Sequence, residues 1–358
     1  MRSWPIAMLL VAAPALAEEI RIEVARGKML ARLDAPGASF DPGSARAGRR
    51  HELAAKDGTL LLDGIPAPRL TVRPGPGGLR LDGKPLPGRL EAWADARGLV
   101  LVNALDLEDY VAAVVAGEVP SRWPAEALRA QAVAARTFAV AQKIAQGPAA
   151  RAHLTASVLD QVYTGAARPA SAALQAARAT AGEVLTYGAA PIAAYFSASC
   201  GGRSETAEGA FHVAQGTTPY LVSEADDADA GRPWEVRRPL SEISAALRRA
   251  GRIVAPVTFL SVASRTGSGR AQTLRAETPS GRRTLLAVEL RQILGYTALP
   301  SLLFDVSVSG GVAVFRGRGS GHGVGLCQQG ARVRALRGES YRDILAHYYP
   351  GAEIRRMY

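Results

Sequence analysis

The chain has 358 residues, which suits one large domain or a core with a smaller appended module. Hydrophobic residues make up 48% and charged residues 21%, a balance that excludes global disorder. Lysine and arginine number 43 against 32 aspartates and glutamates, a net charge of +11, but the arginines do not form one run. Scattered basic charge attracts polyanions in general and is weak evidence for nucleic acid binding.

The first 17 residues have the pattern of a secretory signal peptide. Arg2 gives a basic start, residues 4–13 are apolar, and residues 15–17 (Ala-Leu-Ala) form a small-x-small cleavage site. The apolar run is shorter than a bilayer-spanning helix, and no later stretch is long and apolar enough to form one. We therefore expect an exported protein, periplasmic or associated with the cell wall, with no transmembrane segment. Such a protein meets cell-wall glycan or a membrane surface, so we expect no nucleic acid partner.

Residues 18–102 are expected to form a small β-rich N-terminal module without catalytic equipment. Short alternating stretches such as 20–24 are separated by glycine and proline turns. Residues 99–102, Leu-Val-Leu-Val, indicate a buried strand that ends the module. The expected turns lie at Asp57-Gly58, Asp63-Gly64, residues 75–78 and Asp82-Gly83.

Two helices are predicted next along the chain. The first covers residues 105–115, with Asn103 or Asp106 as its cap. The second begins near Pro124, which suits a first helical turn, and ends at Gly147 and the proline after it.

The second helix has two faces of different character. Arg129, Arg136 and Lys143 fall seven residues apart and form one basic stripe with slow angular drift. A basic stripe binds an anionic ligand or is simply a solvated face, and for Lys143 we prefer the solvated face. Small residues on the other face permit close packing on a neighbour. This narrow apolar face consists of Leu128, Ala132, Ala135 and Ala139.

Helices and strands alternate through the rest of the chain, so residues 103–358 are expected to form one larger domain and the fold class is α+β. A glycine-rich stretch leads into a final helix that begins near Gln328. The other predicted elements are helices at 170–180 and 240–250 and strands at 183–187, 192–197, 257–262, 272–277 and 303–315.

Glu118 is the first candidate for chemistry. It is a lone carboxylate that follows apolar and small residues and lies at a glycine-proline break between the two helices. An apolar setting raises the pKa of a carboxyl group, which suits a general acid. The alternative is an exposed glutamate in a turn.

The segment around His322 is the second candidate. Glycines occupy every second position from 317 to 325, so in an extended segment one face is bare and another backbone or a ligand can approach closely. His322 projects from this bare surface. The segment does not match a phosphate-binding loop. The alternative is a glycine-rich turn with a structural histidine, and we favour the functional interpretation because many glycines cost folding entropy.

The chain has two cysteines, Cys200 and Cys327, and an even count in an oxidising compartment permits one disulfide. A serine or cysteine nucleophile near Ser199 and Cys200, acting with His322, is an alternative, although nothing there resembles a nucleophile elbow. A zinc site made by both cysteines and His322 is a further alternative. We rank that metal site below a disulfide because no two ligands are close in sequence.

Several motifs, in order from about Asn103 to the C-terminus, resemble the stage II sporulation protein D family. Their number and order make the resemblance specific, and the β-rich region before them looks like the variable N-terminal part of that family. The motifs are LEDYVAAVVAGEVPSRWPAEALRAQAVAARTFAV (107–140), QVYTG (161–165), AYFSASCGGRSETAE (194–208), TPYL (218–221) and GRGSGHGVGLCQQGA (317–331).

The resemblance implies a mixed helix and strand catalytic core and a lytic transglycosylase that cleaves peptidoglycan without a cofactor. The family prefers denuded glycan strands, from which amidases have removed the stem peptides. Its catalytic acid corresponds to Glu118, its lysine to Arg129 and its arginine to Arg136. From the other matched motifs we expect substrate-binding roles for Ser199, Tyr220, His322 and Gln328.

Two departures from the family pattern matter. Some relatives carry metal-ligating cysteines just before residue 161, where this chain has Asp160 and no nearby cysteine, so we expect no metal there. Cys200 and Cys327 stand where many relatives have other small polar residues. The resemblance places both glycine-rich motifs beside one cleft, which predicts that the two thiols meet and form a disulfide.

Three hypotheses about function follow. The first is the transglycosylase, with Glu118 as acid and base and with glycan strands and a cell-wall amidase as partners. The second is a non-catalytic glycan-binding protein or amidase regulator on the same fold. The third is a metal- or thiol-dependent hydrolase.

Overall fold

The computed structural model describes residues 18–43, 48–156, 171–211 and 213–358. The predicted signal peptide and Asp160 lie outside these residues. The chain folds into two compact units, one made of residues up to 110 with 146–167 and 356–358, the other of 111–145 and 168–355. Among the described residues, no helix is both long and apolar enough to cross a bilayer.

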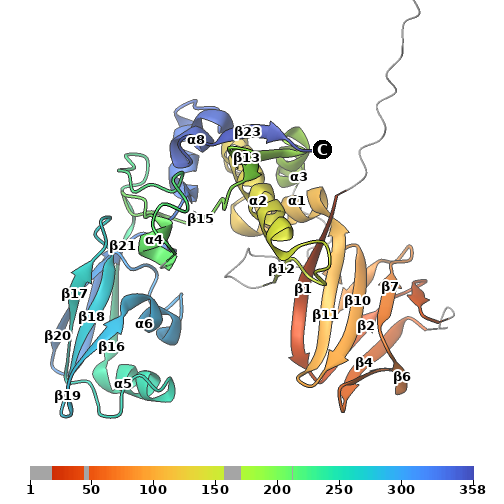
Figure 1. Cartoon of the computed structure of the whole chain (residues 1–358), viewed down its shortest axis with the longest axis horizontal. Helices are drawn as coiled ribbons and strands as arrows, with labels where there is room; N and C mark the ends of the chain where they lie inside the picture. The colour runs from red at the N-terminus through yellow and green to blue at the C-terminus, as the bar shows by residue number, and fades with distance from the viewer. Residues whose placement is uncertain (1–17, 44–47, 157–170, 212) are drawn as a thin grey trace, which may run out of the picture. The chain divides into compact units, whose positions relative to one another are not determined.

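The first unit is a β-sandwich of two six-stranded sheets (Figure 1). Its core is made of apolar side chains from both sheets, such as Leu33 and Leu53 from one and Leu70 and Leu101 from the other. The first sheet, in spatial order, is β12 (Leu154–Thr155), β1 (Glu19–Lys28), β11 (Gly98–Asp106), β10 (Arg89–Asp95), β7 (Leu70–Arg73) and β3 (Ser39–Asp41). The second is β6 (Ile65–Ala67), β5 (Thr59–Leu62), β4 (Arg50–Lys56), β2 (Leu30–Asp34), β8 (Leu79–Leu81) and β9 (Lys84–Leu86).

Three of the predicted turns are two-residue Asp-Gly hairpins in this unit. Asp57, Asp63 and Asp82 adopt φ of 49°, 52° and 50°, and the glycine after each is also at positive φ. Two successive residues at positive φ match the right-handed twist of the flanking strands, which is why Asp-Gly connects β4 to β5, β5 to β6 and β8 to β9.

Strand β11 leads from the sandwich into the second unit. It is buried along nearly its whole length, as the apolar run at 99–102 predicts, and it pairs antiparallel with both β1 and β10. Helix α1 (Leu107–Glu118) follows directly, with the Asp106 carboxylate accepting the backbone N–H groups of Glu108 and Asp109 at 2.8 and 3.2 Å. Asp106 is therefore the cap, and Asn103 is buried in the strand.

The second unit is built around helix α2 (Ala125–Gln146), whose ends match the proline and glycine signals. Between Ala127 and Val140 of α2, every residue except Arg129 is buried. The prediction of one narrow apolar face is therefore wrong, because alanines on every side let neighbours pack around the helix. The elements close to it are α3 (Ser171–Ala179), α4 (Ala207–Phe211), α7 (Gln328–Leu336), α8 (Tyr341–Tyr348), a sheet of β14 (Ala190–Pro191), β13 (Glu183–Tyr187) and β23 (Glu353–Arg356), and the pair β15 (Phe196–Ser197) and β22 (Leu326–Cys327).

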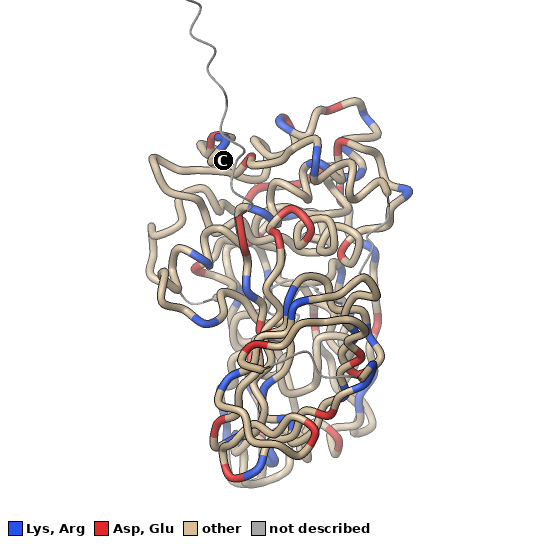
Figure 2. Tube along the Cα trace, turned by 90° about the vertical axis from the view of Figure 1, so that its right-hand side faces the viewer, with Lys and Arg blue, Asp and Glu red and all other residues tan. Residues whose placement is uncertain are grey.

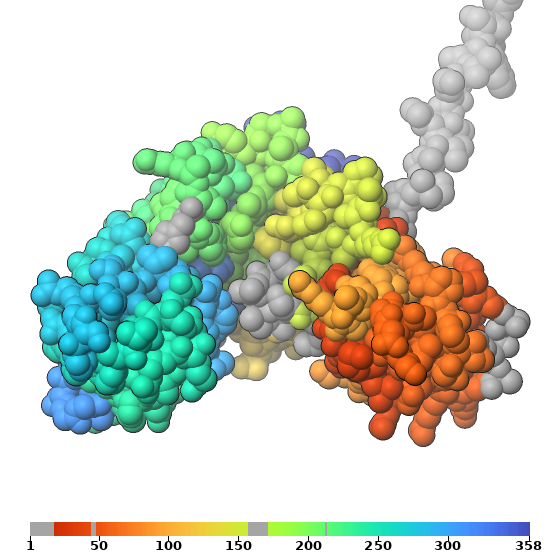
Figure 3. Space-filling model, turned by 60° about the horizontal axis from the view of Figure 1, so that its bottom comes forward, coloured from red at the N-terminus to blue at the C-terminus, as the bar shows by residue number. Residues whose placement is uncertain are grey.

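Residues 233–318 form a separate cluster of strands and helices with its own apolar core, seen as one continuous body coloured teal to blue in Figure 3. The predicted strand at 303–315 is a hairpin, because Gly310 and Gly311 take positive φ and turn the chain. The elements are two sheets, β16 (Pro233–Pro239), β21 (Val312–Arg318) and β20 (Phe304–Ser309), and β17 (Phe259–Arg265), β18 (Ala271–Thr278) and β19 (Gly281–Leu286), with α5 (Leu240–Arg249) and α6 (Ala287–Leu294).

Arg136 does not belong to a surface stripe. Its side chain is 0% exposed, and its guanidinium donates to the carbonyls of Ala177 and Glu183, both at 3.1 Å, and to the Thr180 hydroxyl at 3.4 Å. Ala177 lies in the last turn of α3 and Thr180 directly after that helix, where a cation also interacts well with the helix dipole, and Glu183 begins the next strand. The predicted role in binding substrate anions is therefore wrong for Arg136, since spacing along a helix cannot distinguish a solvated side from a packed one.

We predict that Arg136→Ala lowers the free energy of unfolding by about 3 kcal/mol, because several buried acceptors lose their donor at once. The measurement is urea denaturation followed by far-UV circular dichroism. Arg178→Ala is the matched control, since Arg178 is an exposed arginine on α3 and its removal should change stability by less than about 0.5 kcal/mol. Equal unfolding curves for the two variants would contradict the buried role.

Candidate active site

Glu118 is the last residue of α1 and is half-buried. Its Oε2 accepts a hydrogen bond from Gln328 Nε2 at 3.1 Å, and the same Gln328 amide donates to Gln131 Oε1 at 3.3 Å. Gln328 is the first residue of α7, and Gln131 is buried in the middle of α2. Two consecutive helices, α1 and α2, therefore meet the distant α7 at this carboxylate.

Gln131 fixes the orientation of the Gln328 amide. Its oxygen accepts from Gln328, so the NH₂ group of Gln328 faces Glu118 and its acceptor oxygen does not. Gln131 Nε2 is buried and has no hydrogen-bond partner among the described residues. A donor in this state is available to an acceptor brought by a ligand.

Trp123 and Arg332 extend the site along α7. Trp123 lies in the loop between α1 and α2, and the Arg332 guanidinium carbon lies 5.9 Å from the centre of its ring. Arg332 follows Gln328 by one helical turn, so both lie on the same side of α7. Sequence reasoning missed both residues. A tryptophan five residues after Glu118, in a chain with only four tryptophans, was the available signal.

Arg129, the other arginine of the predicted basic stripe, is partly exposed to solvent. Its side chain is 37% exposed and pairs with Glu126 one turn earlier on α2. The second oxygen of Glu126 accepts the backbone N–H of Tyr341 at 2.8 Å. Arg129 is therefore held in place and still reaches solvent, unlike Arg136.

The two glycine-rich motifs lie against each other. β15 pairs in parallel with β22, Ser199 bridges Ser320, and Glu205 bridges Val324. Gly325 makes this approach possible, because a Cβ there would lie 2.1 Å from the Tyr195 carbonyl oxygen. As predicted from the sequence, another backbone segment, near Tyr195, packs against the glycine-rich stretch.

His322 lies among aromatic rings and is uncharged. Its ring centre is 5.2 Å from that of Phe211 and 6.1 Å from that of Tyr195, and its Nδ1 accepts the backbone N–H of Val324 at 3.0 Å. Burial, helped by the positive charge of Arg291, lowers the pKa of His322 to about 4. The side chain is therefore a neutral hydrogen-bonding group at neutral pH and supplies no positive charge to an anionic ligand.

Ser199 and Tyr220, for which we expect substrate-binding roles, both use their hydroxyl groups in hydrogen bonds within the protein. The Ser199 side chain is buried and donates its hydroxyl proton to Asp229 Oδ2 at 2.6 Å. Tyr220 is also buried, and its hydroxyl accepts the backbone N–H of Ala193 at 3.1 Å. Both hydroxyls hold the chain around the glycine-rich motifs.

Cys200 and Cys327 lie together, as the resemblance predicts, but they are not bonded to each other. Both are buried free thiols, so the predicted disulfide is not formed in the structure. Their sulfur atoms take part in hydrogen bonds with Asp226 and Asp229 instead. Burial raises the pKa of the Cys327 thiol well above its usual value.

Asp229 organises the turn beside these thiols. Burial acts to raise the pKa of Asp229, but hydrogen bonds from Ser199, Cys327 and the backbone of Gly201 and Gly231 outweigh it and hold that pKa below its usual value. His322 is not part of this cluster, so the alternative zinc site of two cysteines and His322 does not match the geometry.

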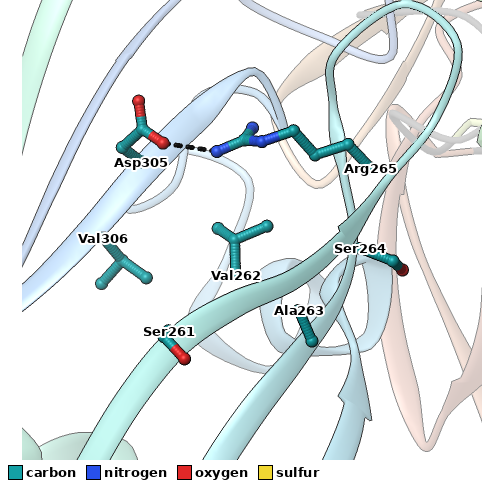
Figure 4. A pocket seen from close by; sticks show the side chains of 7 residues that line it. All are labelled: Ser261, Val262, Ala263, Ser264, Arg265, Asp305 and Val306. Carbon is teal, nitrogen blue, oxygen red and sulfur yellow. Dashed lines mark hydrogen bonds and ion pairs between the residues drawn. The ribbon is translucent and has the colours of Figure 1, made fainter.

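A hollow of about 400 Å³ lies elsewhere in this unit, between strands β17 and β20 (Figure 4). Its one carboxylate, Asp305, is paired with Arg265, and its other lining groups are small apolar side chains and serine hydroxyls. It offers neither a catalytic acid nor an aromatic platform. Along the trace in Figure 2, basic and acidic residues are interspersed, so charge does not mark a second site.

Comparisons with known proteins agree with the motifs. The family model of stage II sporulation protein matches residues 95–187, which include Glu118, Trp123 and Gln131. A second model, a domain of unknown function, matches residues 218–325.

Three relatives cover most of this chain. The stage II sporulation protein D of Bacillus amyloliquefaciens is 32% identical over 271 residues, 71% of this chain and 75% of its own length, and that of Bacillus subtilis is 31% identical over 283 residues, with 71% and 75% covered. The amidase enhancer of Bacillus subtilis is 29% identical over 289 residues, 67% of this chain, but the match spans only 39% of that protein. The chain is a mixed α+β protein that belongs to the stage II sporulation protein D family.

Proposed function

We propose that this protein is an exported lytic transglycosylase that cleaves the bond between MurNAc and GlcNAc in peptidoglycan. The observation that carries the proposal is the half-buried Glu118 at the meeting point of α1, α2 and α7, held by the Gln328 amide. A carboxyl group in partial contact with solvent and fixed by a neutral donor can both give and take a proton.

One carboxylate is sufficient for this reaction. Glu118 gives its proton to the glycosidic oxygen as the bond to MurNAc C1 breaks, and an oxocarbenium-like sugar forms. The C6 hydroxyl of the same MurNAc attacks C1, and the ionised Glu118 takes the hydroxyl proton. The products are a 1,6-anhydroMurNAc end and a new GlcNAc end, and no water is consumed.

The helices that carry Glu118, Gln131 and Gln328, and the loop between the first two, also carry groups that suit a carbohydrate with carboxylates. Trp123, five residues after Glu118, offers a ring for sugar stacking, and Arg129 on α2 and Arg332 on α7 supply positive charge. A denuded strand exposes a lactyl carboxylate on each MurNAc, which pairs well with guanidinium groups. A cell-wall amidase that removes stem peptides would prepare this substrate.

A non-catalytic role on the same fold is the second candidate. One relative bears the name amidase enhancer, which describes an effect on another enzyme. The two candidates differ in their products, because only the transglycosylase generates anhydro ends on purified glycan.

We predict that Glu118→Gln lowers the rate of glycan cleavage by roughly 10²–10⁴-fold while glycan binding remains. Glutamine keeps the shape of the side chain but cannot donate the proton. The measurement is release of anhydro-ended fragments by liquid chromatography with mass detection, beside pull-down on insoluble glycan.

Glu242→Gln is the matched control, because Glu242 is an exposed glutamate on α5, and it should cleave at the wild-type rate. Wild-type turnover by Glu118→Gln would remove Glu118 from the mechanism.

We predict that Gln328→Leu lowers kcat by about 10- to 100-fold and changes KM little, because it removes the amide that donates to Glu118 Oε2 and helps to orient that carboxylate. Gln329→Leu serves as the control, since the neighbouring Gln329 side chain is exposed. If both variants behave alike, Gln328 does not orient the acid.

We predict that strands with intact stem peptides are cleaved more slowly than denuded strands, because amidation removes the lactyl charges. Added salt should slow cleavage of denuded strands, and less so for Arg129→Ala than for the wild type. Arg248→Ala, at an exposed position on α5, should retain the full salt effect. Equal rates on both substrates would contradict this account of specificity.

A further inference from the structure

Two cysteines and two aspartates meet in a buried cluster behind the glycine-rich motifs. Donor atoms of Cys200, Cys327 and Asp226 all lie within 4.8 Å of one another. Asp229 Oδ2 lies 3.1 Å from Cys327 Sγ and 3.6 Å from Cys200 Sγ, so it contacts both sulfurs. All four side chains are buried.

The donors of Cys200, Cys327 and Asp226 lie close enough together for one zinc ion. Zinc binds thiolate sulfur at about 2.3 Å and carboxylate oxygen at about 2.0–2.2 Å, so neighbouring sulfur and oxygen ligands lie about 3.5 Å apart. Cys200 Sγ lies 3.4 Å from Asp226 Oδ2, and Asp229 Oδ2 lies 3.1 and 3.6 Å from the two sulfurs. In the free thiols, protons occupy the positions between these atoms.

The two carboxylates of the cluster differ in their cationic partners. Asp226 has Arg334 at 3.4 Å and the Tyr348 hydroxyl at 2.7 Å. Asp229, in contrast, is held by a hydroxyl, a thiol and two backbone N–H groups, and no cationic side chain among the described residues lies within ion-pair distance of it. A buried carboxylate without a cationic partner, directed at two sulfurs, is an observation independent of the cysteine pairing.

Backbone N–H groups hold the Cys327 sulfur in place. The sulfur accepts the N–H groups of Cys200 at 3.2 Å and of Gly330 at 3.4 Å, the latter at the first turn of α7. Gly330 also leaves room for the cluster, because a Cβ there would lie 2.5 Å from Asp226 Oδ2 and 1.9 Å from the Tyr348 hydroxyl.

We propose that Cys200, Cys327 and Asp226 bind one structural zinc ion, with the Asp229 carboxylate beside the two sulfurs. On binding, each thiol releases its proton to solvent, and the two thiolates and the Asp226 carboxylate bind the divalent cation. The buried Arg270, which donates to the Cys200 carbonyl at 2.7 Å, offsets part of the remaining negative charge. The ion ties the turn at 200–202 to the start of α7, one residue before Gln328.

A disulfide is the competing outcome, and the cluster fits it less well. Oxidation would remove the two S–H donors and leave Asp229 beside neutral sulfur, with no cation and no proton to replace them. Bound zinc takes both sulfurs and the Asp226 carboxylate as ligands and places its positive charge beside Asp229. The site does not depend on the proposed catalytic activity.

The test is the metal content of the full chain, purified without chelator and measured by inductively coupled plasma mass spectrometry. We expect about one zinc ion per chain and, after exchange with cobalt(II), near-ultraviolet absorption from sulfur-to-cobalt charge transfer. Removal of the ion by a strong chelator should lower the melting temperature by several degrees, and added zinc should restore it.

Cys200→Ser and Asp226→Asn should each lose the zinc. Asp227→Asn is the matched control, because Asp227 is adjacent but exposed, and it should keep the zinc. Should the variants fail to fold, the cobalt spectrum of the unmodified chain decides the matter. A chain that carries no stoichiometric metal and gives no cobalt–thiolate absorption, with either a Cys200–Cys327 disulfide peptide or two free thiols by mass spectrometry, overturns the proposal.

Discussion

The parallel pairing of β15 with β22 positions the start of α7, and the candidate site depends on it. The two chain segments approach closely where side chains are missing, because a Cβ at Gly319, Gly321 or Gly325 would meet atoms of residues 195–201. Leu326 and Cys327 form β22, the next residue is Gln328, and its amide donates to Glu118 at the end of α1. A change in this backbone contact would therefore move the donor away from Glu118 without altering any residue that touches it.

The two sides of the glycine-rich motifs have different roles: one presents side chains toward the candidate site, and the other holds the fold. The side of the motifs toward α1 and α2 presents Gln328 and, one turn later, Arg332. The other side buries Ser199, Asp229 and the two cysteines, whose contacts hold the turn. Two consecutive residues of one short segment therefore have different roles: Cys327 holds the turn, and Gln328 donates to Glu118.

Local signals in the sequence were sufficient where the local chain decides the structure. Pro124 and Gly147 mark the bounds of α2, Asp106 caps α1, and the Asp-Gly pairs form the hairpins of the sandwich. Local signals failed where the burial of a residue depends on segments that are distant in the sequence. Arg136 lies on a helix that is packed on every side, and the Trp123–Arg332 contact joins residues that only the folded chain brings together. The motif resemblance found Glu118 and Gln328, but it could not show that one holds the other.

The central claim is that Glu118 acts without water as a reactant, and isotope labelling of the products tests it most directly. Denuded glycan digested by the purified chain in H₂¹⁸O is analysed by mass spectrometry for the sugar at each newly formed MurNAc end. The account predicts 1,6-anhydroMurNAc ends that carry no ¹⁸O. Reducing MurNAc ends with one ¹⁸O at C1 would show hydrolysis and contradict the intramolecular step, and intact glycan would favour the non-catalytic alternative.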